Sequence, residues 1–327
     1  MDQVIDRILV IRLSSLGDIL LATPVIRALR MKYPGALIDA VVKNPYADTL
    51  RCNPHINKLF LFDKKSASGL HSELIGRDYS LIIDLQNNRR SRALVKNAGC
   101  EIRRFRKLTF KKLMLVRFKL NLFVQIKTIT ERYAASAGVE LDGGGLDLFI
   151  DENVEAVNFG DKNYIGLCPG SRHFTKRWPA GYFIELGRNL IERGFGVVLF
   201  GGRDDREICG SISSLITGSV NLQSDDRLYQ TAADMKKCRL VITNDSGLMH
   251  VAAASGVPVM TIFGSSVREF GFQPYGVKNF ILENKSLSCR PCSHIGKPEC
   301  PKKHFKCMKD LTPQSVLDNL EKFTFTL

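Results

Sequence analysis

The stretch from Arg239 to Phe263 limits the possible folds of this chain more than any other part of the sequence. An apolar, β-branched run at 239–243 leads into the polar turn Asn244-Asp245-Ser246-Gly247, and a small-residue helix begins at Leu248. A second apolar run, 257–263, follows after Gly256. This order of strand, turn, helix and strand predicts a parallel βαβ unit with Asp-Ser-Gly at the start of its helix.

Two interpretations of the Asp-Ser-Gly turn are open at this point. The first helical turn has free backbone N–H groups and a positive dipole end, so the turn is suited to a phosphate-bearing ligand. In an open α/β sheet, ligands bind at such strand ends. The alternative is that Asp245 or Ser246 only caps the helix.

The alternation of strands and helices continues through both halves of the sequence. Apolar runs at 7–13, 36–42, 59–62 and 80–85, and again at 164–168 and 196–200, predict an α/β fold with doubly wound, mostly parallel sheets. The 327 residues exceed the ~250–300 at which single cores stop growing. We expect domains at 1–156 and 157–311, followed by a helix over 312–327 that packs back toward the first domain.

Two further loops at predicted strand ends carry charged side chains. Asp18 follows the first strand and opens a helix, where its carboxylate is either a cap or a base that removes a proton from a hydroxyl group. The loop 170–177 combines small and hydroxyl residues with Arg172, Lys176 and Arg177, which suits a phosphate. The loop before Asp18 is not GxGxxG, so nicotinamide binding has little support.

The charge of the chain predicts anionic partners. The formal net charge is +14, and residues 102–127 contain nine Lys or Arg, no acidic residue and interleaved apolar side chains. Such a segment suits an anionic membrane surface, and the alternative is a solvated surface helix. No apolar run reaches the ~18–20 residues of a membrane span. The polar N-terminus does not resemble a signal peptide, so we expect a cytoplasmic protein.

The nine cysteines favour a reducing compartment over a disulfide framework, because their number is odd. Four of them have a spacing that suits a structural zinc site, and the alternative is a set of reduced or redox-active thiols. These four are Cys289, Cys292, Cys300 and Cys307.

Several motifs together resemble glycosyltransferase family 9, the heptosyltransferases of lipopolysaccharide inner-core assembly. The motifs are Ile8–Pro24, Tyr79–Ser91, Pro169–Pro179, Asn244–His250 and the cysteine-rich segment, and they occur in the family's order. The resemblance implies two Rossmann-like domains facing each other across a cleft, the GT-B fold. It also implies transfer of heptose, with inversion and without a bound catalytic metal, from ADP-heptose to a lipid-linked, acidic inner-core oligosaccharide (lipid A–Kdo or a heptosyl acceptor). The enzyme is then expected at the cytoplasmic face of the inner membrane.

The resemblance also assigns roles to residues. Asp18 is the expected general base, and the positively charged Lys176 is expected to bind the donor diphosphate. On the donor side it further implies sugar contacts from Asp245, backbone contacts from Ser246 and Gly247, and positions in the same pocket for Ser171, Thr175 and His250. For His250 a packed helix histidine is the alternative. Arg89, Arg90 and Arg92 are expected to bind the acidic acceptor.

Two alternatives to this function are considered. Ser224-Asp225-Asp226-Arg227 stands in place of the family's Gly-Lys-Thr-like turn, and Gly264-Ser265-Ser266 replaces its usual Gly-Pro-Thr. Both departures leave room for a different nucleotide-sugar donor. A protein of another class, a non-catalytic binder of an anionic ligand or of nucleic acid, agrees with the positive charge. The sequence contains no RNP-type aromatic pattern, GXXG loop or recognition helix, so no nucleic acid partner is expected.

Overall fold

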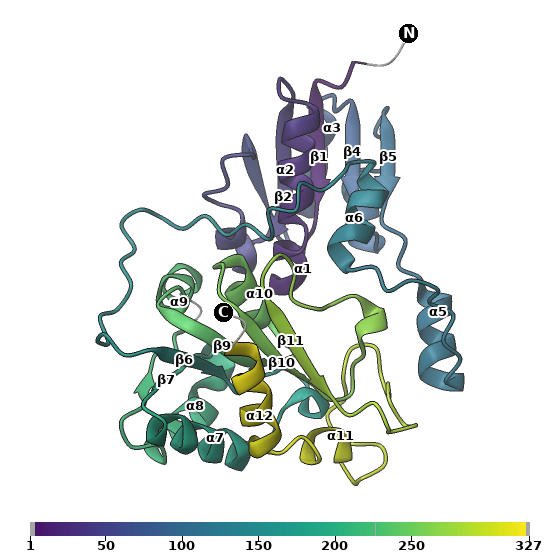
Figure 1. Ribbon diagram of the computed structural model, residues 1–327. Helices are drawn as coiled ribbons and strands as arrows, with labels where there is room; N and C mark the ends of the chain where they lie inside the picture. Colours follow the sequence, from purple (N-terminus) through teal and green to yellow (C-terminus); the bar gives the residue numbers. More distant parts are fainter. Residues whose placement is uncertain (1–3, 226, 325–327) are drawn as a thin grey trace. The chain divides into compact units, whose positions relative to one another are not determined.

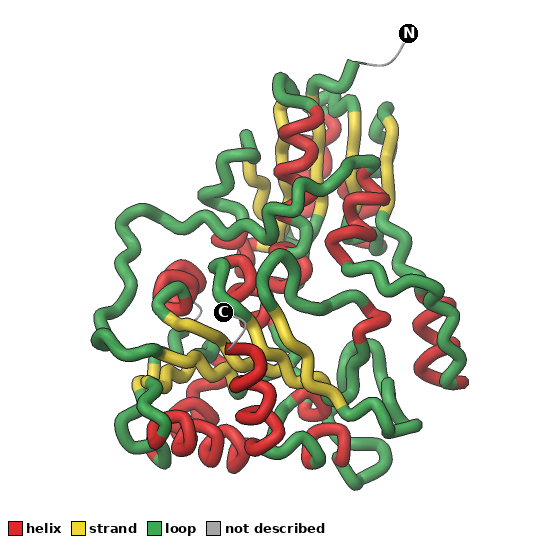
Figure 2. The backbone as a smooth tube through the Cα atoms, viewed as in Figure 1, coloured by secondary structure: helices red, strands yellow, loops and turns green. Residues whose placement is uncertain are grey.

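The computed structural model describes residues 4–225 and 227–324, which form two compact units (Figure 1). The first unit comprises Met1–Lys107 with Lys127–Asp151, and the second comprises Leu108–Ile126 with Glu152–Leu327. Each unit has its own parallel sheet flanked by helices (Figure 2), which confirms the predicted α/β fold. Residues 108–126, which the sequence division assigns to the first domain, group with the second unit.

The first unit is built on a five-stranded parallel sheet in the order β3-β2-β1-β4-β5. Helices α2 and α6 pack together on one face (Figure 1). On the other face, α3 packs with α4. The strand order reverses between β1 and β4, so the loops that follow these two strands meet at a topological switch point. The elements are β1 Arg7–Ile11, α1 Leu16–Leu20, α2 Thr23–Lys32, β2 Leu37–Lys43, η1 Asn44–Thr49, β3 Lys58–Phe62, α3 Ala67–Ile75, β4 Leu81–Asp84, α4 Arg89–Leu94, β5 Glu101–Arg104 and α6 Ile129–Ala137.

The second unit has a six-stranded parallel sheet in the order β11-β10-β9-β6-β7-β8, which is the Rossmann order. Its switch point lies between β6 and β9, which are hydrogen-bonded neighbours. The strands are β6 Tyr164–Cys168, β7 Gly196–Leu199, β8 Val220–Asn221, β9 Cys238–Asn244, β10 Val259–Phe263 and β11 Asn279–Glu283. The helices are α5 Thr109–Leu113, η2 Met114–Phe118, η3 Phe174–Lys176, α7 Ala180–Glu192, η4 Arg203–Asp205, α8 Arg206–Ser214, α9 Leu228–Met235, α10 Gly247–Ala254, η5 Arg268–Phe270, α11 Lys306–Lys309 and α12 Pro313–Thr324.

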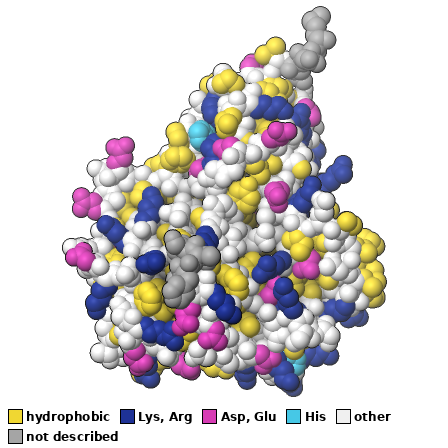
Figure 3. Space-filling model, viewed as in Figure 1, with side chains coloured by type: hydrophobic (Ala, Val, Ile, Leu, Met, Phe, Trp, Pro, Cys, Tyr) yellow, Lys and Arg dark blue, Asp and Glu magenta, His cyan; other side chains and the backbone are white. Residues whose placement is uncertain are grey.

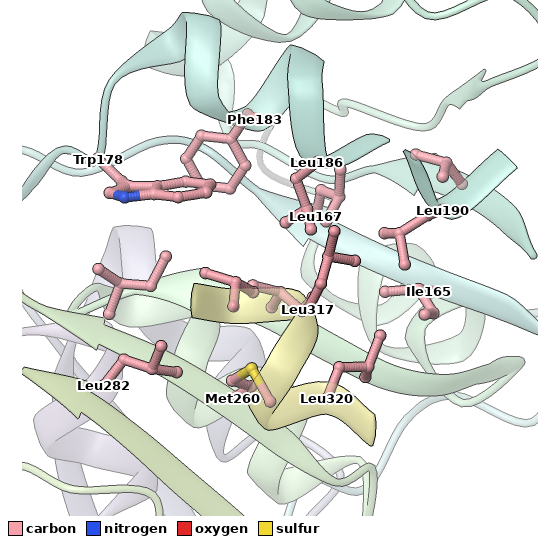
Figure 4. Close-up of a cluster of buried hydrophobic side chains, with 14 of the residues drawn as sticks. Ile165, Leu167, Trp178, Phe183, Leu186, Leu190, Met260, Leu282, Leu317 and Leu320 are labelled. Atoms are coloured by element: carbon pink, nitrogen blue, oxygen red, sulfur yellow. The ribbon is translucent and has the colours of Figure 1, made fainter. Parts of the chain in front are cut away.

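The last helix, α12, packs within the second unit. Its side chains Leu317 and Leu320 lie in the same buried cluster as Leu186 of α7 and Met260 of β10 (Figure 4). This core buries the apolar face of α12 in the second unit, and the packing of the helix toward the first domain stays a prediction. Burial of apolar surface in a core of its own unit is the dominant favourable contribution to its position.

Two local features differ from the sequence-based expectations. The single helix expected after the first strand is divided into α1 and α2, because Pro24 has no N–H group with which to continue the helical ladder. Residues 101–104 form an edge strand at the start of the basic segment, where no strand was expected. Within the described part of the chain, no helix has the length and apolar character needed to cross a bilayer.

Candidate functional site

The switch point of the second sheet brings together three residues from three loops. Lys176 lies in the loop after β6, and Asp245 directly follows β9. The distance from Lys176 Nζ to Asp245 Oδ2 is 2.7 Å. Ser266, which follows β10, donates its hydroxyl hydrogen to the same carboxylate oxygen over 2.5 Å. The Lys176 and Asp245 side chains are only 15% and 7% exposed, so water screens this pair weakly. The cluster therefore places one fixed cation and one fixed carboxylate at the strand ends.

Buried polar contacts hold the loop after β6 in this position. The amide of Asn244, the last residue of β9, donates to the Pro169 carbonyl oxygen over 2.7 Å and accepts from the Trp178 backbone N–H over 3.0 Å. At Gly170 a Cβ atom would lie 2.1 Å from Asp205 Oδ1, so a larger residue does not fit. Asn244 thus clamps both ends of the loop that carries Lys176.

Two hydroxyl residues predicted for the donor site are buried in the same loop. Thr175 Oγ1 accepts from the Lys297 backbone N–H over 2.8 Å and from Ser265 Oγ over 3.0 Å. Ser171 is buried, and its carbonyl oxygen accepts from Arg177 Nε over 2.6 Å. Both residues therefore form hydrogen bonds that stabilise the 170–177 loop itself.

The N-terminus of α10 completes this cluster. Ser246 is the N-cap, with φ −145° and ψ 177°, and its side chain caps no backbone group of the helix. Among the described residues, its buried Oγ has no hydrogen-bond partner. The interpretation that Ser246 is only a capping residue therefore has no support. His250 lies one turn further along α10 and is only 4% exposed, which agrees both with a pocket residue and with a packed histidine.

The charge around this cluster is positive. His173 precedes Lys176 in the same loop, and its pKa is lowered by burial and then by the nearby charges of Lys176 and Arg172. Burial and these neighbouring positive charges both favour the neutral imidazole. An anion placed here meets Lys176, exposed Arg172 and the positive end of α10.

Asp18 lies at the switch point of the first sheet, and both of its carboxylate oxygens have partners within the protein. Arg12 Nη2 lies 2.7 Å from Oδ1, and Ser15 donates to Oδ2 from its hydroxyl over 2.7 Å and from its backbone N–H over 3.2 Å. Asp18 is thus a helix-capping residue, as one interpretation expected, and it also forms an ion pair that simple capping does not need. Its side chain is 18% exposed, so a ligand can reach it.

Two residues that position Asp18 were not singled out from the sequence. Arg12 Nη1 donates to the Leu85 carbonyl oxygen over 2.8 Å, which ties the first loop to the loop after β4. Gln86 Oε1 accepts from the backbone N–H groups of Leu13 and Ser14 over 2.9 and 3.1 Å. The available signal was a charged side chain, Arg12, within the apolar run 7–13. Its partner across the sheet could not be deduced without the strand order.

The three arginines predicted to bind the acceptor lie on α4, and all three are exposed. Arg89 and Arg90 line a hollow of about 410 Å³, together with Lys64, Ser68, His71 and four apolar residues. Arg92 turns to Asn87 instead, and its Nε donates to Oδ1 over 3.0 Å. Asn88 caps α4 by accepting from two backbone N–H groups at its start, which fixes the direction of this cationic helix end.

The four cysteines considered for zinc have different surroundings. Cys289 Sγ lies 3.8 Å from His304 Nε2, and Cys307 is buried in the core, which raises the pKa of its thiol to about 12. Over the described residues, no group of three or more His, Cys, Asp or Glu side chains is arranged to hold a metal ion. The geometry gives the zinc site no support, and it stays a prediction that metal analysis of the purified protein tests.

Comparison with known proteins places these sites in a family context. Residues 68–303 match the profile described as Glycosyltransferase family 9 (heptosyltransferase). Lipopolysaccharide heptosyltransferase 2 of Escherichia coli (strain K12) is 27% identical over 352 aligned positions, which cover 96% of this chain and 97% of that protein. Lipooligosaccharide heptosyltransferase 2 of Campylobacter jejuni is 31% identical over 169 positions, or 50% of this chain, and that match spans about half (52%) of the relative's length.

A solved structure supports the fold. The structure of E. coli ADP-heptose lps heptosyltransferase II matches with a TM-score of 0.73 and 24% sequence identity, covering 98% of this chain and 99% of that chain. This similarity, together with the two parallel sheets, confirms the GT-B class of fold.

Proposed function

The chain belongs to glycosyltransferase family 9, and on this premise we propose that it transfers heptose from ADP-heptose to the inner core of lipopolysaccharide. The observation that carries the proposal is the Lys176–Asp245–Ser266 cluster at the N-terminus of α10. Relatives named as heptosyltransferases over nearly the full chain support the sugar, and the similar E. coli protein, which is named an ADP-heptose heptosyltransferase, supports the nucleotide.

The second unit is proposed to bind the donor. The diphosphate accepts hydrogen bonds from the backbone N–H groups of Ser246 and Gly247, and Lys176 neutralises charge on the departing ADP. Asp245 holds hydroxyl groups of the sugar, because a carboxylate is a strong acceptor for them. Fixed positive charge where negative charge develops is usually the largest electrostatic contribution to such a transfer.

The first unit is proposed to supply the general base. Asp18 takes the proton of the acceptor hydroxyl while its oxygen forms the new bond to the anomeric carbon of heptose. The bond from that carbon to the donor phosphate breaks, and ADP leaves with the electron pair. Attack from the face opposite the leaving group inverts the anomeric configuration. The charge on ADP is assigned to Lys176, so no step of this proposal uses a metal.

The cationic hollow beside α4 is proposed to receive the acidic acceptor. Arg89 and Arg90, with Lys64, bring positive charge to this hollow, and apolar side chains, Ser68 and His71 complete its lining. Carboxylates and phosphates of an inner-core oligosaccharide are suited to arginine, which binds such groups through two parallel hydrogen bonds. Arg92 is proposed to act at the edge of this surface, because its side chain is directed toward Asn87.

The segment 108–126, which forms most of the basic stretch 102–127, is proposed to hold the enzyme at the cytoplasmic face of the inner membrane. It exposes large apolar side chains, among them Phe110, Leu113 and Phe118 at 66%, 55% and 59%, beside its lysines and arginines. Figure 3 shows hydrophobic side chains gathered over α5 at the right-hand edge of the view. Apolar groups beside cations favour an anionic lipid surface, to which each cation contributes about 1 kcal/mol.

The experiment that tests this function is a transfer assay with ADP-heptose and a Kdo-bearing lipid acceptor, run beside UDP-hexose and GDP-hexose. Turnover with ADP-heptose alone is the expected result. Turnover with another donor alone would replace the donor and leave the reaction class intact. If ADP binds but no donor is consumed, the chain is a binder, and the proposed function is wrong.

A further inference from the structure

Arg290, which no motif singled out, is one of the most highly bonded side chains of the second unit. It belongs to the cysteine-rich segment, and its side chain is only 5% exposed. Its guanidinium donates to the carbonyl oxygens of Gly264 over 2.6 Å, Ser266 over 2.8 Å and Phe263 over 3.3 Å. Three carbonyl oxygens of one short turn are therefore held by a single side chain.

Two further acceptors connect the same guanidinium to the end of β11. Arg290 Nη1 donates to the Asn284 carbonyl oxygen, and Nη2 lies 3.0 Å from Glu283 Oε2. Glu283 is 6% exposed, and its other oxygen lies 3.0 Å from Arg268 Nε. The buried charge of Arg290 is thus paired, and the turns after β10 and β11 are fixed to each other.

The turn that Arg290 holds carries contacts to the donor cluster. Ser266 donates to Asp245 Oδ2 over 2.5 Å, and Ser265 donates to Thr175 Oγ1 over 3.0 Å. The Ser265 backbone N–H also donates to the Thr175 carbonyl oxygen over 3.2 Å. Displacement of this turn would therefore change the position of Asp245 and of the residue that precedes Lys176.

A lysine does not replace Arg290 in this geometry. The guanidinium is a planar fork with five N–H donors, whereas the lysine ammonium is a compact group with three. The oxygens that accept from Arg290 belong to the turns after β10 and β11, and one ammonium group cannot reach both turns. The arrangement depends on the shape of the side chain as well as on its charge.

We propose that Arg290 is a positioning residue for donor binding: it holds the 263–266 turn so that Ser266 orients Asp245 beside Lys176. The inference rests on the proposed donor site, because its consequence is measured through the nucleotide. Arg290 itself contacts the turn and is assigned no contact with the substrates.

The test compares Arg290→Met and Arg290→Lys with the wild type. A further variant, Ser266→Ala, removes only the hydrogen bond from Ser266 to Asp245. Calorimetric titration with ADP and initial rates against each substrate are measured. We expect the Kd of ADP and the KM of the donor to rise about 10–100-fold in both Arg290 variants, with the KM of the acceptor unchanged. Ser266→Ala should raise the donor KM in the same direction. The matched control is Arg193→Met, which removes an exposed ion pair with Glu321.

The outcomes separate this inference from the proposed function. If the wild type neither binds ADP nor transfers sugar, the proposed function fails. If the wild type does both and Arg290→Lys equals it, the fork geometry is not required, and the positioning role is overturned. A lower kcat with unchanged donor KM would indicate only a smaller folded fraction and would also overturn it. If Arg290→Met does not fold, an unchanged donor KM in Ser266→Ala is sufficient to reject the inference.

Discussion

At the residue scale, Asp18 and Lys176 share one arrangement, because each is held by a buried neighbour of opposite charge. Arg12 lies 2.7 Å from Asp18, and Asp245 lies 2.7 Å from Lys176. Each pair fixes a side chain that would otherwise lose rotamer freedom when substrate binds. The sequence predicted Asp18 and Lys176 from their places at strand ends. It did not predict the roles of Arg12 and Ser266, because these depend on contacts with the distant residues Leu85 and Asp245.

Replacement of Asp18 by Asn should separate proton removal from binding. Asn keeps the size of the side chain and still accepts from Ser15, but it does not take up a proton. We expect kcat to fall by ~10²–10⁴-fold, with the Kd of ADP unchanged in calorimetry. Asp48→Asn, at an exposed pair with Arg51, serves as the control and should retain activity. Wild-type turnover in Asp18→Asn would exclude Asp18 as the base.

Replacement of Lys176 by Met should weaken both donor binding and the chemical step. Met retains most of the length of the side chain and removes the charge next to the leaving diphosphate. Rates should fall by ~10²–10³-fold, the range for loss of one electrostatic contact in the transition state, and ADP should bind less tightly. Steady-state kinetics and ADP titration measure both effects, with Lys58→Met as the control at an exposed pair with Glu73. Unchanged kinetics would remove Lys176 from the donor site.

At the element scale, the strands were the most predictable part of the molecule. The run 164–168 is continuous and apolar, and 240–243 is also rich in β-branched residues, as is typical of parallel strands buried on both faces. The edge strand β5 was missed because its sequence, Glu-Ile-Arg-Arg, is polar and its pairing with β4 depends on the sheet. Tertiary contacts overrode local preference there.

The last helix gives a prediction about stability. Leu317 is 1% exposed and lies in the core of the second unit. Leu317→Ala should lower the free energy of unfolding by about 2–5 kcal/mol, because it removes buried methyl groups and leaves a cavity. Urea denaturation followed by the fluorescence of Trp178, the one tryptophan of the sequence, measures the loss. A change below about 1 kcal/mol would show that α12 is not part of this core.

The segment 108–126 gives a prediction about membranes. A double variant, Phe110→Ser with Phe118→Ser, should reduce binding to vesicles that contain anionic lipid, while transfer to a soluble acceptor analogue persists. Co-sedimentation with vesicles at two salt concentrations measures the apolar and electrostatic parts separately. Leu215→Ser, at an apolar side chain that is 50% exposed in the same unit, is the control. Equal binding by the double variant and the wild type would contradict the proposed membrane surface.

At the scale of the whole molecule, the candidate catalytic and donor-binding residues of both units lie at the topological switch points of their sheets. Each sheet reverses its strand order once, between β1 and β4 or between β6 and β9, and the predicted base and donor residues follow these strands. The fold class followed from the alternation of strands and helices. The division into units followed only in part, because segment 108–126 leaves the first unit and groups with the second. The basic composition of 102–127 distinguishes this segment, but it does not indicate which unit the segment joins.

The measurement that tests the central claim most directly is a proton NMR time course of ADP-heptose with a Kdo-bearing acceptor and the wild-type enzyme. We expect release of ADP together with a product whose anomeric configuration is opposite to that of the donor, because the acceptor hydroxyl displaces ADP in one step. Retention of configuration would require a covalent intermediate, for which a base at Asp18 is not sufficient. Retention, or no consumption of ADP-heptose at all, would contradict the proposed mechanism.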